Sequence, residues 1–422
     1  MNNKNIILPV KGTRDFYPPD WAFQTWLYRQ IKEVSESFGF EEYEGPIIES
    51  LDLYAAKSGE ELVKKQAFTL KDQAGNTLAL RPEMTPTLAR MVAQKIGQLI
   101  LPVKWFTYGR RFRYEKPQKG RGREFFQWDA DILGPDSPQA DAETIAVAVE
   151  LLKKIGLTPE EVVIKINDRK LLEELLSSIY IPVEKIKAVF GLIDKVDKVS
   201  SDDFMQIGME IGLKKDQVAG IVQIINEKEN YLKSPWLLDV LKQLKNYGVS
   251  EYVVFDPKIV RGLDYYTGTV FEAWDIKGQF RAIWGGGRYD NLVEQTGSRQ
   301  KVPGVGFAMG DMVLAELLKS NKKYPVLDFN PTRILVTVFN TDLFDKSLFL
   351  ANKLRAEGIN CEVYLMPEAK MDKQLKYADI KGIPFIVILG PDEIKNDTVT
   401  VKNLKTREQK TFGFTELLEV LK

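Results

Sequence analysis

The amino-acid sequence predicts an α+β domain built on a mixed, mainly antiparallel sheet, interrupted by a helical insertion and followed by a small α/β domain. Within residues 102–134, two segments of alternating polarity flank a Gly- and Lys-rich loop, which predicts an antiparallel hairpin. Between about 168 and 246, strand patterns give way to Leu-, Ile- and Lys-rich helical sequence. After a polar, proline-bearing linker at 319–331, strands and helices alternate, which favours a partly parallel sheet. The expected units are therefore 1–325, which contains the insertion, and 332–422.

Individual elements follow from the spacing of apolar residues. Residues 20–38 predict an amphipathic helix because their apolar residues recur mostly at intervals of three and four: Phe23, Trp26, Leu27, Ile31 and Val34. Ser137 followed by Pro138 is typical of a helix start, with a buried stripe after it. In the C-terminal part we expect, in order, strand 334–339, helix 342–357, strand 362–366, helix 369–381 and strand 384–389.

Composition narrows the class of protein. The 422 residues carry 59 basic and 59 acidic side chains, which argues against a non-specific nucleic-acid coat but allows a local basic surface. The one cysteine, Cys361, excludes an intrachain disulfide or a thiolate metal cluster. Neither a signal peptide nor a membrane-spanning run is recognisable. We therefore expect a cytoplasmic protein.

The sequence contains no histidine. This absence excludes Ser-His-Asp catalysis, HExxH metalloproteases and zinc deaminase chemistry, which all need an imidazole. Any reaction must use carboxylates, arginines, tyrosines or a bound ion. Compositional drift would explain the absence as well as selection would.

The predicted hairpin at 111–131 concentrates polar side chains. On its second strand Phe125, Gln127, Asp129 and Asp131 share one face, and on the first Arg113 and Glu115 share a face. A solvated face is the ordinary explanation of half-polar strands. However, the loop carries several cations that suit a phosphate chain: Lys116, Lys119, Arg121 and Arg123.

Several motifs in this region resemble the class II aminoacyl-tRNA synthetases. FRYE, the following loop and REFF resemble motif 2 of that family, and PQKGRGREFFQ resembles the version found in histidyl enzymes. Gly45-Pro46 resembles motif 1, whose proline lies at a dimer interface. LRPEMTPTLAR at 80–90 resembles the LRPE-T segment of the same family.

Other segments extend the resemblance over essentially the whole chain. RGLDYYTGTVFE at 261–272 resembles the histidine-specific signature, and GGGRYDNL at 285–292 resembles the segment after it. The C-terminal part, with KQLKYADIKGIPFIVILG at 373–390, resembles the anticodon-binding domain. The resemblance implies a histidine–tRNA ligase that activates histidine with ATP and transfers it to tRNA(His).

The chemistry of activation suits a site without histidine. The attacking carboxylate is already ionised at pH 7, so no general base is needed. The resemblance implies that Arg113 and Arg261 hold the α-phosphate as the catalytic pair and that Arg121 reaches the β- and γ-phosphates. Glu115 would meet the adenine amino group and Phe125 would stack on the ring. Mg²⁺ is expected to accompany ATP, but no protein-bound metal and no prosthetic group is expected. A surface salt bridge is the alternative for Arg261.

The resemblance also implies the sites for histidine and tRNA. The residues expected around histidine, the first three at its α-ammonium and the rest at its imidazole, are Glu83, Thr85, Gln127, Asp131, Tyr266 and Tyr289. Ordinary core packing is the alternative for the two tyrosines, and Asp131 is shorter than the glutamate common at its position. Gln118, Lys119 and Arg123 are expected to contact the tRNA acceptor stem. A homodimer is expected from the motif 1 segment.

Motif 3 departs from the family pattern. In GVGFAMGDMVLAELL (304–318), Val313 stands where the family has an arginine for the γ-phosphate. Arg81 and Arg111 are candidates to compensate, unless the phosphates lie differently or ATP binding is degraded. That last possibility gives an alternative function, a histidine-binding paralogue like the regulatory subunit of ATP phosphoribosyltransferase. A synthetase for another amino acid conflicts with RGLDYYTG.

Overall fold

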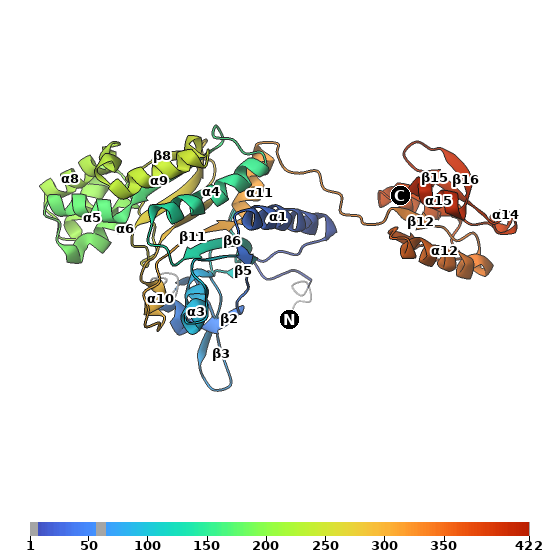
Figure 1. Ribbon diagram of the computed structural model, residues 1–422, viewed down its shortest axis with the longest axis horizontal. Coiled ribbons are helices and arrows are strands. Elements are labelled where there is room, and N and C mark those ends of the chain that lie inside the picture. The colour runs from blue at the N-terminus through green and yellow to red at the C-terminus, as the bar shows by residue number, and fades with distance from the viewer. Residues whose placement is uncertain (1–6, 56–64, 422) are drawn as a thin grey trace. The chain divides into compact units, whose positions relative to one another are not determined.

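A computed structural model describes residues 7–55 and 65–421. Two compact units are present, one built mainly from residues 25–325 and the other mainly from 326–422 (Figure 1). Among the described helices, none combines the length and the apolar character that crossing a bilayer requires.

An eight-stranded mixed sheet forms the core of the larger unit (Figure 1). Its strands, in spatial order, are β1 (Glu41–Glu42), β5 (Val103–Phe112), β6 (Glu124–Leu133), β11 (Gly304–Gly310), β10 (Trp284–Arg288), β9 (Thr269–Asp275), β7 (Val162–Asp168) and β8 (Val253–Phe255). The edge pairs β1–β5 and β7–β8 are parallel, and the pairs between them are antiparallel. The predicted mixed, mainly antiparallel sheet is confirmed.

The hairpin of β5 and β6 pairs Val103 with Leu133 and Phe112 with Glu124. Strand β5 ends at Phe112, so the prediction that Arg113 and Glu115 share a strand face is wrong. The reason is that the chain leaves the ladder: the backbone N–H of Tyr114 donates to Gln66 (2.6 Å), and that of Glu115 turns back to Arg113 (2.7 Å). Both residues therefore lie in a turn beside the hairpin loop.

Helices flank this sheet, and their starts follow the predicted signals. Helix α4 (Pro138–Lys154) begins after Ser137 with proline in its first turn, and its apolar stripe is fully buried. The other helices described before residue 326 and outside the insertion are α1 (Pro18–Ser37), α2 (Leu51–Ala55), α3 (Thr85–Lys95), α10 (Leu292–Gln295) and α11 (Asp311–Ser320). Helix α11 thus includes the first two residues of the segment predicted as a linker.

The segment between β7 and β8 is helical. It contains α5 (Arg169–Ser178), α6 (Ile186–Ile193), α7 (Ser201–Glu210), α8 (Lys215–Asn226) and α9 (Pro235–Asn246). Helices α5 to α8 enclose a hydrophobic core of their own, which includes Leu176, Val189 and Ile221. Val260, from the loop after β8, also packs into this core. The helical segment is therefore tied directly to the loop that carries Arg261.

A second, smaller sheet lies in the N-terminal part. Its strands are β2 (Ile48–Ser50), β4 (Thr77–Leu80) and β3 (Phe68–Lys71), all antiparallel. Large apolar side chains on and beside it remain exposed, including Ile47, Ile48 and Leu70. Burial of such a surface by a partner would be favourable.

The C-terminal unit is a partly parallel five-stranded sheet with helices. Its elements are β12 (Ile334–Val336), α12 (Phe344–Ala356), β13 (Cys361–Val363), α13 (Met371–Ile380), β14 (Phe385–Ile388), α14 (Pro391–Lys395), β15 (Thr398–Asn403), β16 (Gln409–Gly413) and α15 (Phe414–Leu421). Strand β12 is parallel to both β13 and β14, and β15 and β16 add antiparallel pairs. The predicted order of strands and helices through residue 389 is confirmed.

Candidate active site

A cavity of about 420 Å³ lies where β6 and β10 begin and β9 and β11 end. We call it the central cavity. Five of the residues predicted from the sequence line it: Arg113, Arg121, Phe125, Gln127 and Arg261. They come from the turn after β5, the hairpin loop, strand β6 and the loop before β9. The fold thus brings side chains far apart in sequence to one space.

Arg113 is held by two neighbours. Its Nε donates to the carbonyl oxygen of Pro82 (2.9 Å), within the LRPE segment. Its guanidinium lies over the ring of Phe125, 5.3 Å from the centroid, which is a cation–π distance. The contacts fix the charge at the wall of the central cavity beside an aromatic ring.

Arg121 and Glu115 form an ion pair across the hairpin loop. The carboxylate is nearly buried, with 8% of its side chain exposed, whereas 34% of the Arg121 side chain is exposed. Gly120 precedes Arg121 with a φ of +71°, a left-handed conformation that glycine adopts without strain. The loop turn therefore places Arg121 at the cavity while Glu115 balances its charge.

Arg261 occupies a left-handed backbone conformation with a φ of +57°, which is uncommon for a residue with a side chain. Its Nη1 donates to Glu272 (2.6 Å) on β9. Burial alone would lower the pKa of Arg261, but the neighbouring Tyr266 and Glu272 outweigh burial and raise it. The guanidinium is charged at any physiological pH. Arg261 does form a salt bridge, but the pair is partly buried, with 20% of the Arg261 side chain and 16% of the Glu272 side chain exposed.

Gly285 on β10 makes room for Arg261. A Cβ atom at Gly285 would lie 2.6 Å from Nη1 of Arg261, closer than real Cβ contacts allow. The first glycine of GGGRYD therefore lets the guanidinium of Arg261 lie directly on the backbone of β10, and a larger residue there would displace this guanidinium.

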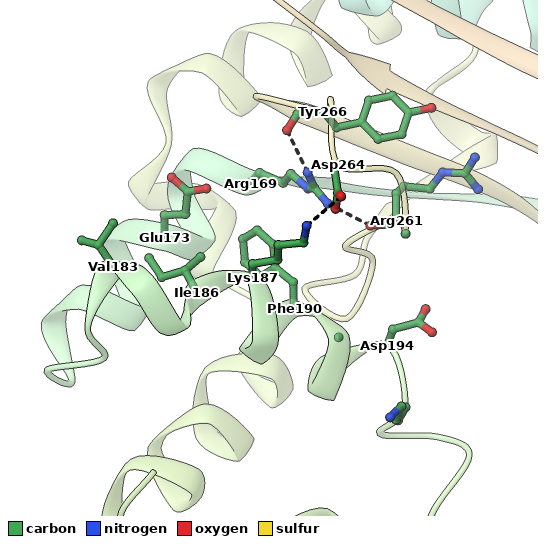
Figure 2. Close-up of a pocket in the computed structure, with 13 residues that line it drawn as sticks. Arg169, Glu173, Val183, Ile186, Lys187, Phe190, Asp194, Arg261, Asp264 and Tyr266 are labelled. Atoms are coloured by element: carbon green, nitrogen blue, oxygen red, sulfur yellow. Dashed lines mark hydrogen bonds and ion pairs between the residues drawn. The ribbon is translucent and has the colours of Figure 1, made fainter. Parts of the chain in front are cut away.

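Arg169, at the start of α5, holds the loop that carries Arg261. It donates to the carbonyl oxygens of Val260 (3.0 Å), Tyr266 (2.8 Å) and Arg261 (2.9 Å). Arg169, Arg261 and Tyr266 line a second cavity of about 700 Å³ (Figure 2). In the same cavity Lys187 pairs with Asp264 (2.7 Å). Figure 2 shows the guanidinium of Arg261 pointing away from Arg169. Arg169 thus fixes the backbone while leaving the side chain of Arg261 for the central cavity.

Two of the three residues predicted for the imidazole, Asp131 and Tyr289, meet in a buried polar contact. The hydroxyl of Tyr289 donates to Oδ1 of Asp131 (2.5 Å). Within the described ranges 7–55 and 65–421, no group hydrogen-bonds to Oδ2 of Asp131, which is buried. Burial raises the pKa of Asp131 well above its ordinary value; the Tyr289 hydrogen bond opposes this, and Asp129 adds to it. The unsatisfied oxygen is an acceptor for a ligand N–H.

Gly306 on β11 allows this arrangement, because a Cβ atom there would overlap the carboxylate of Asp131. Tyr266 and Tyr289 pack in one hydrophobic cluster with Tyr265, so core packing and a polar contact coexist at Tyr289. The side chain of Tyr289 therefore fills space in the hydrophobic cluster with its ring and binds Asp131 with its hydroxyl.

The residues predicted for the α-ammonium lie in separate contacts. The hydroxyl of Tyr265 donates to Glu83 (3.0 Å), and Nε2 of Gln127 donates to Asp129 (2.7 Å). Thr85 is partly buried as the first residue of α3. Gln127 lines the central cavity, whereas Glu83 and Thr85 line neither cavity described above.

The residues predicted for the acceptor stem differ in exposure. Gln118 and Lys119 are exposed on the hairpin loop. Arg123 turns inward: its Nε donates to the carbonyl oxygen of Glu115 (3.2 Å), and its guanidinium lies 4.1 Å from the ring centroid of Tyr114. Arg123 therefore braces the base of the loop.

The two arginines predicted to compensate for Val313 are committed elsewhere. Arg81 donates to the carbonyl oxygens of Gly45 (2.8 Å) and Arg110 (2.9 Å) and is 1% exposed. Arg111 pairs with Asp129 (2.7 Å), and both side chains are fully buried. Val313 itself lines the central cavity, but neither arginine does. That prediction is therefore wrong.

Several residues at the site were not predicted from the sequence: Arg169, Glu272, Tyr265 and Arg281. Glu272 is the last residue of the RGLDYYTGTVFE segment (261–272), so this motif could have indicated it. Tyr265 likewise lies within it. Arg169 and Arg281 fall outside every segment that carried the resemblance, and only the folded structure brings them to the site.

Comparison with known proteins agrees with this geometry. Residues 12–312 match the family described as Histidyl-tRNA synthetase, and residues 333–422 match an anticodon binding domain. The chain is 38% identical to a histidine–tRNA ligase of Leptospira biflexa, covering 98% of this chain and 96% of that protein. It is also 38% identical to a chloroplastic/mitochondrial histidine–tRNA ligase of Arabidopsis thaliana, covering 97% of this chain and 85% of that protein.

Solved structures give the same result. The histidyl-tRNA synthetase of Nostoc sp. PCC 7120 superposes with a TM-score of 0.80 at 26% identity, covering 98% of each chain. Together with the matched sequence families, this similarity spans both units. The chain belongs to the histidyl-tRNA synthetase family.

Proposed function

We propose that this protein is a histidine–tRNA ligase, which activates L-histidine with ATP and transfers the histidine to the 3′ end of tRNA(His). The observation that carries the proposal is the convergence of Arg113, Arg121 and Arg261 on one cavity beside Phe125. A concentration of fixed guanidinium groups next to an aromatic ring suits a nucleoside triphosphate.

In the first step a histidine carboxylate oxygen attacks the α-phosphorus of ATP. A new P–O bond forms, the bond to the bridging oxygen breaks, and pyrophosphate leaves with the electron pair. The nucleophile is ionised at neutral pH, so the protein needs to supply position and positive charge. Fixed cations at the α-phosphate stabilise the charge that develops there. In the second step a hydroxyl at the tRNA 3′ end attacks the activated carbonyl. An ester C–O bond forms, the C–O bond to the phosphate breaks, AMP leaves with the electron pair, and the hydroxyl proton is lost to solvent.

The contacts described above support the role proposed for each nucleotide-binding residue. Arg113 and Arg261 hold the α-phosphate from opposite sides, and Arg121 leaves Glu115 to meet the β- and γ-phosphates. Phe125 stacks on adenine, while Glu115, released from Arg121, accepts from the adenine amino group. Mg²⁺ enters as part of the nucleotide substrate, bound to its phosphates.

For histidine, Asp131 and Tyr289 bind the imidazole and Tyr266 forms a wall of its pocket. The free Oδ2 of Asp131 supports this role, since a ring N–H would satisfy it. Glu83, Thr85 and Gln127 bind the α-ammonium group. A site that satisfies both ring nitrogens rejects analogues without them by roughly 10⁴-fold or more.

We further propose that the enzyme is a cytoplasmic homodimer that binds tRNA with both units. Gln118 and Lys119 meet the acceptor stem, Arg123 braces the loop that carries them, and the C-terminal unit reads the anticodon. Exposed Ile47 and Ile48, next to Gly45-Pro46, support a dimer interface at the small sheet. The alternative, a non-catalytic regulatory relative, is not favoured, because the curated relatives found are histidine–tRNA ligases along their length.

The decisive assay is ATP–pyrophosphate exchange with each amino acid in turn. We expect exchange with L-histidine and none above background with the other amino acids. No exchange with histidine would contradict the proposal, and exchange with a different amino acid would reassign the substrate.

A further inference from the structure

We propose that Arg281 is a phosphate-binding residue for ATP, supplying from strand β10 the cation that α11 lacks at position 313. The inference rests on the proposed function, since it concerns the β- and γ-phosphates of the same nucleotide. Four observations on the geometry carry it.

The first is topology. Strand β10 pairs antiparallel with β11, with Trp284 opposite Met309. Arg281 shortly precedes β10 and Val313 shortly follows β11, so both lie beyond the same end of the sheet. Both also line the central cavity. A cation from residue 281 can therefore serve the space that a side chain at residue 313 would reach.

The second observation is availability. The other basic side chains that line the central cavity each have a polar contact. Three form ion pairs: Arg121 with Glu115, Arg261 with Glu272 and Lys198 with Asp194. Arg113 donates to Pro82 and covers the ring of Phe125. Arg281 makes no hydrogen bond or ion pair with any residue in the described parts of the chain. It is thus free to bind a ligand without breaking an existing contact.

The third observation is the local charge. Burial lowers the pKa of Arg281, and the positive charges of Arg121 and Arg113 lower it further, against the opposing effect of Glu115. Arg281 thus lies near two positive charges that the charge of Glu115 opposes. A polyphosphate placed among them would relieve this repulsion, and guanidinium forks bind phosphate oxygens in pairs.

The fourth observation is the packing at Val313. The hairpin loop lies on this position: a Cβ atom at Gly120 would be 3.2 Å from the Val313 side chain, which is 4% exposed. Lys119 in the same loop lies 5.2 Å from the ring centroid of Phe280 and 3.6 Å from Glu316 on α11. The hairpin loop therefore contacts both Val313 and the segment that carries Phe280 and Arg281. Because residue 313 is a small apolar valine, the loop packs on it and no charge comes from that position.

The test compares Arg281→Ala and Arg281→Lys with the wild-type full-length enzyme in ATP–pyrophosphate exchange. Arg299→Ala is the matched control, because Arg299 is exposed and lines neither cavity. Losing one charge-assisted contact to phosphate should lower kcat/KM for ATP by about 10- to 100-fold in Arg281→Ala. Arg281→Lys should recover part of the loss, and Arg299→Ala should match the wild type.

A second readout assigns the contact to the outer phosphates. A non-hydrolysable histidyl-adenylate analogue has no β- or γ-phosphate, so its affinity and the KM for histidine should be the same in Arg281→Ala as in the wild type. The inference is overturned if Arg281→Ala retains the wild-type kcat/KM for ATP, or if it weakens the analogue as much as it weakens ATP. Wild-type enzyme without histidine-dependent exchange would instead refute the proposed function, and the inference with it.

Discussion

At the scale of single residues, the site combines groups that are costly to bury. Asp131 sits fully buried with one unsatisfied oxygen, and its pKa is raised chiefly by that burial. Arg261 adopts a left-handed backbone conformation, which stabilises nothing by itself. Such features persist where a ligand completes them, so both are consistent with the histidine and phosphate roles proposed for them.

Replacing Asp131 by asparagine should separate function from stability. Because the folded-state pKa of Asp131 is raised, protonated Asp131 contributes stability below its ordinary pKa of 3.8, and this contribution is lost as pH rises through the folded-state value. Asp131→Asn should therefore match the wild type in unfolding free energy near pH 4 and exceed it increasingly toward pH 8, as urea titrations can measure. Its KM for histidine should rise by about 10-fold or more. A variant less stable than the wild type at every pH would show that burial of the Asp131 charge does not destabilise the fold.

How far the sequence identified these residues depends on the kind of contact. Residues inside recognised motifs, such as Arg113, Phe125 and Arg261, do line one cavity, because their short segments carry both the backbone turn and the charge. Arg281 could not be found, since nothing local distinguishes a cavity arginine from a surface one. The misassignment of Arg111 has the same origin: its partner Asp129 lies across the hairpin, and cross-strand pairing depends on register.

At the scale of elements, helices and strands with a regular spacing of apolar residues were predictable from the sequence, whereas the residues at which strands end were not. Helix α4 and the alternation of β12 to β14 follow directly from apolar spacing and helix-start residues. The end of β5 did not follow from spacing, because Tyr114 donates to Gln66 from another segment. Strands β15 and β16 were also absent from the prediction, although they complete the C-terminal sheet.

The small sheet of β2, β4 and β3 leads to a prediction at this scale. Ile48 on β2 is 46% exposed next to the motif 1 segment, so a charge there should oppose burial against a second copy. We expect the wild type to sediment as a dimer and Ile48→Glu to shift toward monomer with reduced exchange activity. Ile380→Glu is the matched control, as Ile380 is equally apolar but lies on α13 of the C-terminal unit. A fully active wild-type monomer would contradict the dimer.

At the scale of the whole molecule, two units with separate cores carry the parts that a synthetase needs. The larger unit holds the central cavity, and the C-terminal unit matches an anticodon binding domain. The absence of histidine from all 422 residues is compatible with this chemistry, because activation uses cations and an ionised substrate carboxylate. Such a protein could be made while histidine is scarce, and rapid loss of its synthesis during histidine starvation would count against that hypothesis.

If Arg113 and Arg261 act on a single phosphate, the variant Arg261→Ala should lose the activation of histidine. We expect L-histidine-dependent ATP–pyrophosphate exchange to fall by about 100- to 1,000-fold, because a fixed cation at the developing charge is lost. The circular dichroism spectrum should remain that of the wild type, and Arg299→Ala should retain full exchange. Near-normal exchange by folded Arg261→Ala would show that Arg261 does not act on the α-phosphate.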